Sequence, residues 1–284
     1  MRNRLGVIGY PLGHSLSPEI QNGAIKELGL NLTYEKWPLK EADLKEFVTS
    51  VKKEYSSILG FNVTIPYKET ILKYLDEISE RAQVIGAVNT VHLRAGKLVG
   101  ENTDGMGFIE SLKRQGMKIE NKSVLIIGTG GAAKGISISL AFSGLKTIDF
   151  VGRNKKAASL LVNAVKRLSG KSNWYSFSEL ATMSLSKYDF IAQTTPLGMK
   201  GIKGKLEFPY NHLRENQVLV DIIYNPLKTD FLLEGEKRGT PIVNGVGMLV
   251  CQGAEALALW TGKKPNKDLM EKILIANLVE AKNE

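Results

Sequence analysis

The sequence contains very little cysteine and no long apolar run. Cys251 is the only cysteine in 284 residues, so no disulfide can form within the chain and nothing indicates secretion. No run of about 18 apolar residues occurs, which argues against a membrane-spanning helix. The first five residues carry positive charge but lack the apolar stretch and cleavage site of a signal peptide. We therefore expect a cytoplasmic protein that has no membrane partner.

Histidine is scarce as well, since the chain holds only His14, His92 and His212. No Cys/His spacing and no obvious set of carboxylates indicates a metal site. Low-complexity segments and internal repeats are also missing. With 43% hydrophobic and 24% charged residues, the composition is that of an ordinary globular protein, and no metal is expected.

Positive charge exceeds negative charge, with 38 Lys and Arg against 29 Asp and Glu, and the net charge is +9. The basic residues are scattered and lie next to acids, as in Lys40-Glu41 and Lys45-Glu46. No basic stripe interleaved with aromatic residues occurs, so no nucleic-acid partner is expected. The charge favours a generic solvated surface, and attraction of small anionic ligands is the alternative. The sequence leaves monomer and homodimer open.

Apolar stretches of strand length alternate with amphipathic stretches of helical length. This alternation predicts an α/β fold class with parallel sheets and helices on both faces. The expected strands are residues 5–8, 33–37, 60–63, 124–127, 148–151, 190–193 and 218–221. The expected helices are residues 18–28, 42–51, 132–143, 157–168, 248–260 and 267–281. Residues 90–93 and 97–100 predict an antiparallel hairpin around Gly96.

A chain of this length favours two domains. No flexible linker is evident, so any boundary between the domains must be short. The segments 102–105 and 244–247 are rich in glycine and asparagine, and we expect the boundaries there.

The expected strand 124–127 runs directly into Gly128-Thr129-Gly130-Gly131-Ala132-Ala133, and a helix of small residues follows. Gly128 permits a tight turn, Gly130 lets the backbone approach a pyrophosphate, and Ala133 allows the helix to pack closely on the strand. The helix N-terminus offers unpaired amides to phosphates. A Walker-type loop is excluded because no Gly-Lys-Ser/Thr follows. The order favours a dinucleotide loop over a structural glycine-rich turn.

The next strand bears on the choice between NAD and NADP. An acid at its end binds the ribose diol of NAD, whereas a cation accommodates the 2′-phosphate of NADP. Asp149 lies inside the strand, while Arg153, Lys155 and Lys156 follow its expected end at Val151. The sequence therefore predicts NADP. Two plainer readings stay open: Asp149 as a polar residue of an edge strand, and the lysines as a solvated helix start.

Polar residues interrupt apolar stretches in four segments, residues 9–18, 61–69, 86–90 and 100–105. Ligands of open α/β sheets bind beyond the carboxyl ends of strands, where three of these segments fall. Together they supply the hydroxyl, amide, amine and carboxylate groups that a polyhydroxy carboxylic acid requires. Plainer explanations exist: Ser17 is a good N-cap for a helix, residues 61–69 fit a half-exposed strand, and the others fit Asx turns.

Lys68 and Asp104 are the best candidates for acid–base chemistry in these segments. A lysine amine can move a hydroxyl proton if its site keeps its pKa workable. A carboxylate nearby would hold a substrate hydroxyl but would also favour the protonated lysine. The sequence leaves open which group takes the proton, and also whether Asp104 merely caps a helix that starts near Gly105.

Eight ordered segments resemble the shikimate dehydrogenase family over nearly the whole chain. They are Gly-x-Pro-Leu-Gly-His-Ser-Leu-Ser-Pro at 9–18, Asn-Val-Thr-Ile-Pro-Tyr-Lys at 62–68, Gly-Ala-Val-Asn-Thr at 86–90, Asn-Thr-Asp-Gly at 102–105, the loop 128–133, Thr-Pro-Leu-Gly-Met at 195–199, Asp-Ile-Ile-Tyr-Asn-Pro at 221–226 and Gly-Val-Gly-Met-Leu-Val-Cys-Gln at 245–252. The resemblance implies an NADP-dependent oxidoreductase that interconverts 3-dehydroshikimate and shikimate in chorismate and aromatic amino-acid biosynthesis.

The resemblance also implies an N-terminal α/β substrate domain, residues 1–103 and 248–284, and an inserted Rossmann-type dinucleotide-binding domain, residues 104–247. Lys68 and Asp104 would be the catalytic pair. Shikimate would be held by Ser15, Ser17, Asn62, Thr64, Lys68, Asn89, Asp104, Tyr224 and Gln252. The NADP site would be formed by Gly128, Thr129, Gly130, Gly131, Ala132, Arg153, Asn154, Lys155, Ile222 and Gly245.

Two segments depart from the family pattern. Residues 193–195 read Gln-Thr-Thr where the family often has Asn-x-Thr, and residues 152–154 read Gly-Arg-Asn where it usually has Asn-Arg-Thr. The NAD-using quinate/shikimate branch carries an acid just after the arginine, and Asn154-Lys155 disfavours that branch. The alternatives are a quinate/shikimate dehydrogenase with relaxed cofactor or substrate choice and a non-catalytic NADP-binding regulator. A regulator has no need of both Lys68 and Asp104.

Overall fold

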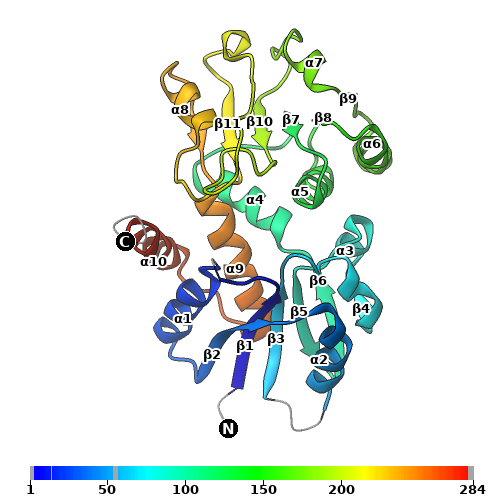
Figure 1. The fold of residues 1–284 in the computed structure, drawn as a ribbon, viewed down its shortest axis with the longest axis vertical. Helices are drawn as coiled ribbons and strands as arrows, with labels where there is room; N and C mark the ends of the chain where they lie inside the picture. The colour runs from blue at the N-terminus through cyan, green and yellow to red at the C-terminus, as the bar shows by residue number, and fades with distance from the viewer. Residues whose placement is uncertain (1–2, 14, 54–56, 281–284) are drawn as a thin grey trace. The chain divides into compact units, whose positions relative to one another are not determined.

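The computed structural model describes residues 3–13, 15–53 and 57–280 and divides the chain into two compact units. The first unit comprises Met1–Gly107 and Val250–Glu284, and the second comprises Phe108–Leu249. The divisions fall inside helices α4 (Asp104–Arg114) and α9 (Val246–Thr261). Each unit has its own six-stranded sheet (Figure 1).

The sheet of the first unit has the strand order β2-β1-β3-β5-β6-β4. Strand β1 pairs in parallel with β2 and β3, whereas β5 pairs antiparallel with β3 and β6. Every residue of β1 from Leu5 to Gly9 is buried, as expected of a central strand that is covered on both faces. The strands are β1 (Asn3–Gly9), β2 (Leu32–Pro38), β3 (Ile58–Val63), β4 (Glu77–Ile78), β5 (Thr90–Arg94) and β6 (Lys97–Glu101).

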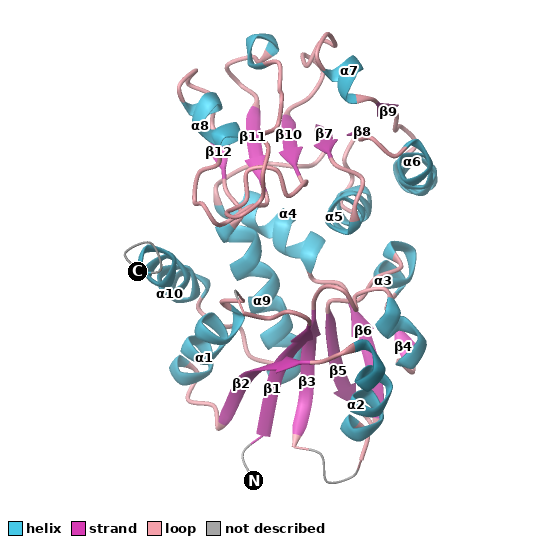
Figure 2. Ribbon diagram, viewed as in Figure 1, coloured by secondary structure: helices cyan, strands magenta, loops and turns pink. Residues whose placement is uncertain are grey.

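Helices flank this sheet (Figure 2). They are α1 (Ser17–Glu27), α2 (Leu44–Val51), α3 (Glu80–Ile85), the end of α9 and α10 (Lys267–Glu280), with 3₁₀ turns at Glu41–Asp43 and Thr70–Tyr74. On one side of the sheet the ring of Phe47 from α2 packs edge-on against Phe61, which is fully buried. Elsewhere α1 packs along α10. The apolar stripes of the helices thus cover the buried strands.

The second unit is built on a sheet in which every pair of neighbouring strands is parallel, in the order β12-β11-β10-β7-β8-β9. The chain proceeds outward from β7 to β9 on one side and from β10 to β12 on the other. Ligands bind at such a switch point, beyond the carboxyl ends of the strands. The strands are β7 (Ser123–Ile127), β8 (Thr147–Val151), β9 (Trp174–Tyr175), β10 (Phe190–Gln193), β11 (Val218–Asp221) and β12 (Ile242–Val243). The helices are α5 (Gly131–Phe142), α6 (Lys155–Ser169), α7 (Phe177–Leu180) and α8 (Asp230–Glu236), with a 3₁₀ turn at Tyr210–His212.

The predicted α/β class is confirmed, and the seven predicted strands and the hairpin are present, with β10 and β11 at their predicted bounds. The short strands β4, β9 and β12 and the short helices α3, α7 and α8 were not predicted, because so few residues show no periodicity. Among the described residues, no helix has the length and apolar character needed to cross a membrane.

The plainer explanation of Ser17 as the N-cap of the first helix is wrong. Helix α1 begins at Ser17 itself, and the preceding Leu16 occupies the cap position without a side-chain bond to the backbone. Pro18 therefore stands at the second helical position. Instead, Ser15 Oγ accepts a long hydrogen bond from the amide of Ser17, at 3.4 Å. Helix capping consequently does not account for the Ser17 hydroxyl.

Candidate functional site

Lys68 and Asp104 form an ion pair in the first unit. Lys68 Nζ donates to Asp104 Oδ2 at 2.6 Å, and the two side chains are 32% and 18% exposed. Lys68 follows the end of β3, and its carbonyl accepts from the amide of Val88 at 2.8 Å, which ties it to the segment before β5. Asp104 is the first residue of α4, where a carboxylate is favoured by the helix dipole. The pair is accessible enough to meet a substrate.

Asn89 holds the other oxygen of the same carboxylate. Its Nδ2 donates to Asp104 Oδ1 at 2.8 Å and to Thr103 Oγ1 at 3.0 Å, and it lies 3.5 Å from Gln252 Oε1 of α9. Its Oδ1 accepts from the backbone amide of Thr103 at 2.8 Å. Four of the residues predicted to act together, Lys68, Asn89, Asp104 and Gln252, are thus brought together.

Helix capping alone does not account for the Asp104 carboxylate. Helix α4 begins at Asp104, close to the predicted start near Gly105, so Thr103 precedes the helix, and the carbonyl of Thr103 accepts from the amide of Gly107 at 2.8 Å. Both carboxylate oxygens of Asp104 bind side chains, those of Lys68 and Asn89. Its own amide donates to Asn102 Oδ1 at 3.2 Å. The carboxylate is therefore directed at the polar cluster.

Of the other residues predicted to bind shikimate, Ser15, Ser17 and Thr64 belong to the first unit and Tyr224 belongs to the second. Thr64 follows β3 and is half-buried, with its amide bonded to Ile8 O at 2.9 Å. Ser15 and Ser17 are also half-buried, at the start of α1. Tyr224 belongs to the second unit, where burial raises the pKa of its hydroxyl. His14 of the same motif lies outside the described residues.

Asn62 is already fully engaged with protein groups. Its Nδ2 donates to Asn89 O and to Thr90 Oγ1, both at 3.0 Å, so neither amide hydrogen is left for a ligand. Its Oδ1 accepts from the hydroxyl of Tyr34 at 2.7 Å, and its side chain is buried. These bonds favour a supporting role for Asn62 over direct contact with substrate.

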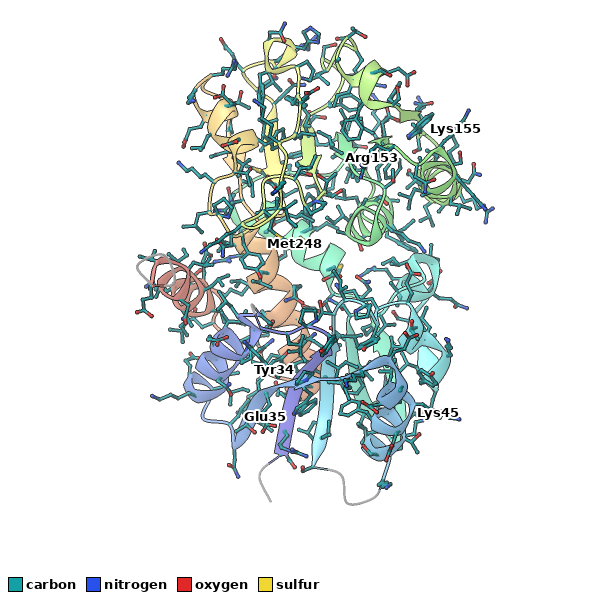
Figure 3. All side chains as sticks on the ribbon, viewed as in Figure 1. Tyr34, Glu35, Lys45, Arg153, Lys155 and Met248 are labelled. Carbon is teal, nitrogen blue, oxygen red and sulfur yellow. The ribbon has the colours of Figure 1, made fainter. Side chains whose placement is uncertain are left out.

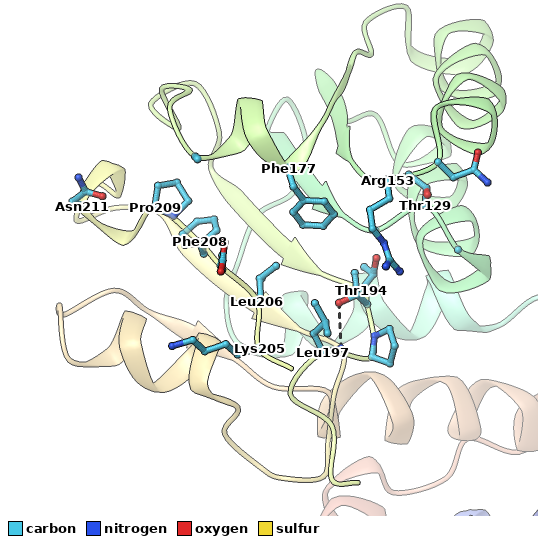
Figure 4. A pocket seen from close by; sticks show the side chains of 18 residues that line it. Thr129, Arg153, Phe177, Thr194, Leu197, Lys205, Leu206, Phe208, Pro209 and Asn211 are labelled. Carbon is cyan, nitrogen blue, oxygen red and sulfur yellow. Dashed lines mark hydrogen bonds between the residues drawn. The ribbon is translucent and has the colours of Figure 1, made fainter. Parts of the chain in front are cut away.

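A cavity of about 810 Å³ opens at the carboxyl ends of the strands of the second unit. Three loops that follow β7, β8 and β10 form one side of it, and α7 with residues 205–211 forms the other. Figure 4 shows the side chains of Arg153, Phe177 and Leu206 directed into it. Its lining residues are Gly128, Thr129, Gly130, Gly152, Arg153, Asn154, Phe177, Ala181, Thr194, Thr195, Pro196, Leu197, Lys205, Leu206, Glu207, Phe208, Pro209 and Asn211.

The glycine-rich loop has the geometry that a dinucleotide requires. Gly128 has a φ of +124°, and a Cβ there would lie 2.4 Å from Thr194 Oγ1, so only glycine fits. No atom lies within 4 Å of the position that a Cβ on Gly130 would occupy, which leaves the backbone accessible from the cavity. Gly131 and Ala132 follow as the first residues of α5, outside the lining. An open backbone followed by a helix N-terminus is an arrangement that suits an anion.

Arg153 lines the cavity, whereas Asp149 does not. The carboxylate of Asp149 is fully buried: Oδ2 accepts from Lys187 Nζ and Tyr188 OH, and Oδ1 accepts from the amide of Asn173, all at 2.7 Å. The edge-strand reading of Asp149 is wrong, because β8 lies between β7 and β9. A carboxylate engaged in this way has no free position for a ribose diol.

Of the other residues predicted to bind the cofactor, Asn154 lines the cavity, whereas Lys155, Ile222 and Gly245 do not. Asn154 lines the cavity and also caps α6, accepting from the amide of Ala157 at 3.0 Å. Lys155, labelled in Figure 3, is not among the lining residues, and its amine lies 5.9 Å from the centroid of the Trp174 ring. A Cβ on Gly245 would lie 2.0 Å from Ile222 O, so this close approach needs glycine; neither residue lines the cavity.

Gln193, which departs from the family pattern, stabilises the turn after β10. It is buried, and its Nε2 donates to Thr195 O at 3.0 Å and Leu197 O at 2.9 Å, while its Oε1 accepts from the amide of Thr195. The glutamine therefore holds the turn that follows β10, and the residues of this turn line the cavity. Among the described residues, no group of three His, Cys, Asp or Glu side chains is placed to hold a metal ion.

Several residues of the site were not predicted. Tyr34, Thr90 and Thr103 bind Asn62 and Asn89 but looked like ordinary strand and turn residues. Phe177, Leu206 and Phe208 line the cavity from segments without a recognisable motif. A signal for Thr90 and Thr103 did exist, since both are hydroxyl residues inside the predicted polar segments.

Comparison with known proteins agrees with this geometry. The profile of the shikimate dehydrogenase substrate binding domain matches residues 7–91, and that of the shikimate 5′-dehydrogenase C-terminal domain matches residues 245–275. The chain is 43% identical to the shikimate dehydrogenase (NADP(+)) of Methanococcus maripaludis, over 95% of each chain. The chain belongs to the shikimate dehydrogenase family. It is thus similar to oxidoreductases along nearly its whole length.

Two solved structures are similar to it throughout. A shikimate dehydrogenase in complex with NADP⁺ has a TM-score of 0.89 at 36% identity, covering 97% of this chain and 96% of that one. The Listeria monocytogenes shikimate 5-dehydrogenase, in complex with shikimate and NAD, has a TM-score of 0.91 at 33% identity, covering 96% of both chains. These two relatives bind different nicotinamide cofactors, so the cofactor choice of this chain has to be argued from its own residues.

Proposed function

We propose that this protein is an NADP-dependent shikimate dehydrogenase, an oxidoreductase that reversibly reduces 3-dehydroshikimate to shikimate. The observation that carries the proposal is the pair formed by Lys68 Nζ and Asp104 Oδ2 at 2.6 Å, with Asn89 on the second carboxylate oxygen. An amine and a carboxylate held together suit the proton transfer that accompanies alcohol oxidation. The membership of the family supplies the identity of the substrate.

NADPH, when bound, supplies the hydride for the carbonyl carbon of 3-dehydroshikimate. In that direction the ammonium of Lys68 donates the proton to the carbonyl oxygen, and in the reverse direction its amine accepts the hydroxyl proton. Asp104 accepts a hydrogen bond from the substrate hydroxyl and keeps Lys68 in reach of it. Asn89 holds Asp104, so the carboxylate keeps its orientation.

We assign substrate binding to residues 1–103 and 248–284 and NADP binding to residues 104–247. The remaining polar groups expected to hold shikimate are those of Ser15, Ser17, Thr64, Tyr224 and Gln252. The open side of Gly130 and the N-terminus of α5 suit the pyrophosphate. Gly131, Ala132, Ile222 and Gly245 would complete the NADP site as its supporting backbone.

The preference for NADP rests on Arg153. Its side chain is the cation that the loop after β8 contributes to the cavity, at the place where the 2′-phosphate of NADP is expected. The one acid of that strand, Asp149, is bound by Lys187 and Tyr188 and cannot take the ribose diol instead. Asn154 also lines the cavity, and Lys155 is the next residue along the chain.

We place the protein in the cytoplasm, since its single cysteine needs no oxidising compartment. Its partners in this activity are small molecules. Neither nucleic acid nor membrane is needed, and monomer and homodimer fit the proposal equally.

The proposal is tested by following the absorbance of NADPH after shikimate and NADP are mixed with the purified protein. We expect turnover with this pair, far less with NAD, and far less when quinate replaces shikimate. Efficient turnover of quinate with NAD would instead indicate the quinate/shikimate branch. NADP binding without turnover of either substrate would indicate a regulator and contradict the proposal.

A further inference from the structure

Four hydrogen bonds run in one direction from Tyr34 to Asp104 inside the first unit. Tyr34 OH donates to Asn62 Oδ1 at 2.7 Å, and Asn62 Nδ2 donates to Thr90 Oγ1 at 3.0 Å. Thr90 Oγ1 donates to Asn89 Oδ1 at 3.0 Å, and Asn89 Nδ2 donates to Asp104 Oδ1 at 2.8 Å. Asn62, Thr90 and Asn89 therefore each accept from the group before them and donate to the next, and Asn89 Oδ1 also accepts from the amide and hydroxyl of Thr103. The series ends on the carboxylate that holds Lys68.

The direction of the series is set by backbone groups that have only one role. Asn62 Nδ2 also faces the carbonyl of Asn89, which can only accept, so the amide of Asn62 cannot be reversed. Asn89 Oδ1 also faces the backbone amide of Thr103, which can only donate. Once both amides are fixed, Asn62 must donate to Thr90, and Asn89 must donate to Asp104.

All of the intermediate groups are buried. Tyr34, Asn62, Asn89, Thr90 and Thr103 are each at most 8% exposed. Hydrogen bonds in such surroundings are stronger than in water, and successive bonds polarise one another in the same sense. Burial raises the pKa of Tyr34 well above its ordinary value, so its hydroxyl stays a donor at any working pH.

Tyr34 is itself held on several sides. Its backbone amide and carbonyl are both bound by the side-chain amide of Asn22 on α1, at 2.9 and 2.8 Å. Its ring packs against Trp260 of α9, with centroids 6.1 Å apart, and the Trp260 indole donates to Val91 O at 2.9 Å. Figure 3 shows Tyr34 in the sheet of the first unit. These contacts hold the hydroxyl of Tyr34, which is the first donor of the series, in place.

We propose that Tyr34 is a positioning residue for the reaction, which orients Asp104 and Lys68 through Asn62, Thr90 and Asn89. The proposal rests on the proposed function. Tyr34 itself binds Asn62 rather than the catalytic pair. Its hydroxyl satisfies and polarises the Asn62 amide, whose direction is set by the carbonyl of Asn89, and the last donor in the series, Asn89, restrains the carboxylate in the orientation that meets the substrate hydroxyl. Small misplacements of reacting groups lower rates strongly, so the loss of a distant hydroxyl is measurable in kcat.

The test uses two substitutions that remove one hydroxyl each and two matched controls. Tyr34→Phe removes the first donor, and Thr90→Val removes the third group while keeping its shape. Thr90→Ser keeps the hydroxyl and so restores the series. Tyr188→Phe is the control for losing a buried tyrosine hydroxyl, because Tyr188 OH also donates at 2.7 Å to a buried side chain, that of Asp149.

We expect Tyr34→Phe to lower kcat for shikimate about tenfold, with the KM for NADP unchanged. Thr90→Val should lower kcat at least as much, and Thr90→Ser and Tyr188→Phe should stay within twofold of the wild type. The double variant Tyr34→Phe/Thr90→Val should be no slower than Thr90→Val alone, because the series is already broken nearer to Asp104. If Tyr34→Phe does not fold, the two Thr90 variants still decide.

A Tyr34→Phe enzyme with kcat within twofold of Tyr188→Phe would overturn the proposal, as would effects of Tyr34→Phe and Thr90→Val that multiply. If the wild type does not turn over shikimate at all, the proposed function fails instead. In that case the coupling between Tyr34 and Lys68 is tested by NMR titration of the Lys68 amine. A titration that moves in Tyr34→Phe and Thr90→Val, but not in Thr90→Ser or Tyr188→Phe, supports the coupling without any activity. An unmoved titration contradicts it.

Discussion

Lys187 donates to the fully buried carboxylate of Asp149 at 2.7 Å, from the segment that precedes β10. The amine also lies over the rings of Tyr175 and Tyr188, 5.3 and 4.9 Å from their centroids. A buried carboxylate needs such partners, because an unpaired charge in the interior is very costly. The only acid of β8 is thereby engaged by protein groups, and Arg153 is the residue that we propose selects the cofactor.

Arg153→Asp should weaken NADP binding about ten- to a hundredfold relative to NAD. A charge-assisted contact to the phosphate is lost, and the new carboxylate repels it. Dissociation constants for both cofactors, measured by calorimetry, check the prediction. Arg167→Asp, with the same charge change in the last turn of α6, is the control. An unchanged ratio of the two affinities would remove Arg153 from the phosphate site.

Lys68→Ala should lower kcat about 10²–10⁴-fold, which is the range for loss of an acid–base group. Binding of NADP should be unaffected, because Lys68 and the glycine-rich loop belong to different units. Lys45→Ala, on the exposed face of α2, is the matched control and should keep the wild-type rate. A Lys68→Ala enzyme that keeps most of its kcat would contradict the catalytic assignment.

Asp104→Asn should lose activity by orders of magnitude while its melting temperature stays close to that of the wild type. The amide preserves the shape but removes the charge that pairs with Lys68. Whichever way the amide is turned, its NH₂ group faces a donor, either Lys68 Nζ or Asn89 Nδ2. Calorimetry and kcat/KM for shikimate are measured on the same preparation. Near-normal kcat/KM in this variant would return Asp104 to a purely structural role.

Asp221 predicts a pH dependence of stability. Burial raises its pKa from 3.8 to about 6, although Thr229 Oγ1 and the amide of Ile223 both donate to it. The folded state thus keeps a proton that the unfolded state releases near pH 4. The contribution of this group to the free energy of unfolding is therefore full below about pH 4 and is lost as the pH rises through 6.

Asp221→Asn should abolish that loss, since its amide can accept from Ile223 and donate to Thr229. We expect the variant to exceed the wild type in stability at pH 8 by up to about 3 kcal/mol, the equivalent of the shift in pKa, and to equal it below about pH 4. Urea unfolding at both pH values measures the difference. A difference that is the same at both pH values would show that Asp221 ionises normally in the folded protein.

Much of the fold was predictable because long apolar strands leave a strong pattern. The bounds of β10 and β11 follow directly from apolar runs that are bounded by polar residues. Ser17 and Asp149 could not be assigned in the same way. Whether a serine caps a helix depends on where the helix starts, and whether an aspartate meets a ligand depends on Lys187 and Tyr188, which lie about forty residues away.

The polar site of the first unit was predictable only in part. The pair of Lys68 and Asp104 was expected from the polar segments that carry it, and the structure joins the two side chains. The role of Tyr34 could not be foreseen, because its hydroxyl reaches Asn62 on β3 across the intervening strand β1. Such contacts depend on strand order and register, which apolar periodicity alone does not determine.

The full use of the hydrogens on Asn62 and Asn89 restricts how this protein can evolve. A single substitution at either position leaves a buried donor or acceptor without a partner, at a cost of about 1–3 kcal/mol. Tolerated change in this part of the molecule must therefore come as paired replacements, in which a lost donor is matched by a lost acceptor. Homologues should accordingly vary at positions 34, 62 and 90 together rather than one at a time.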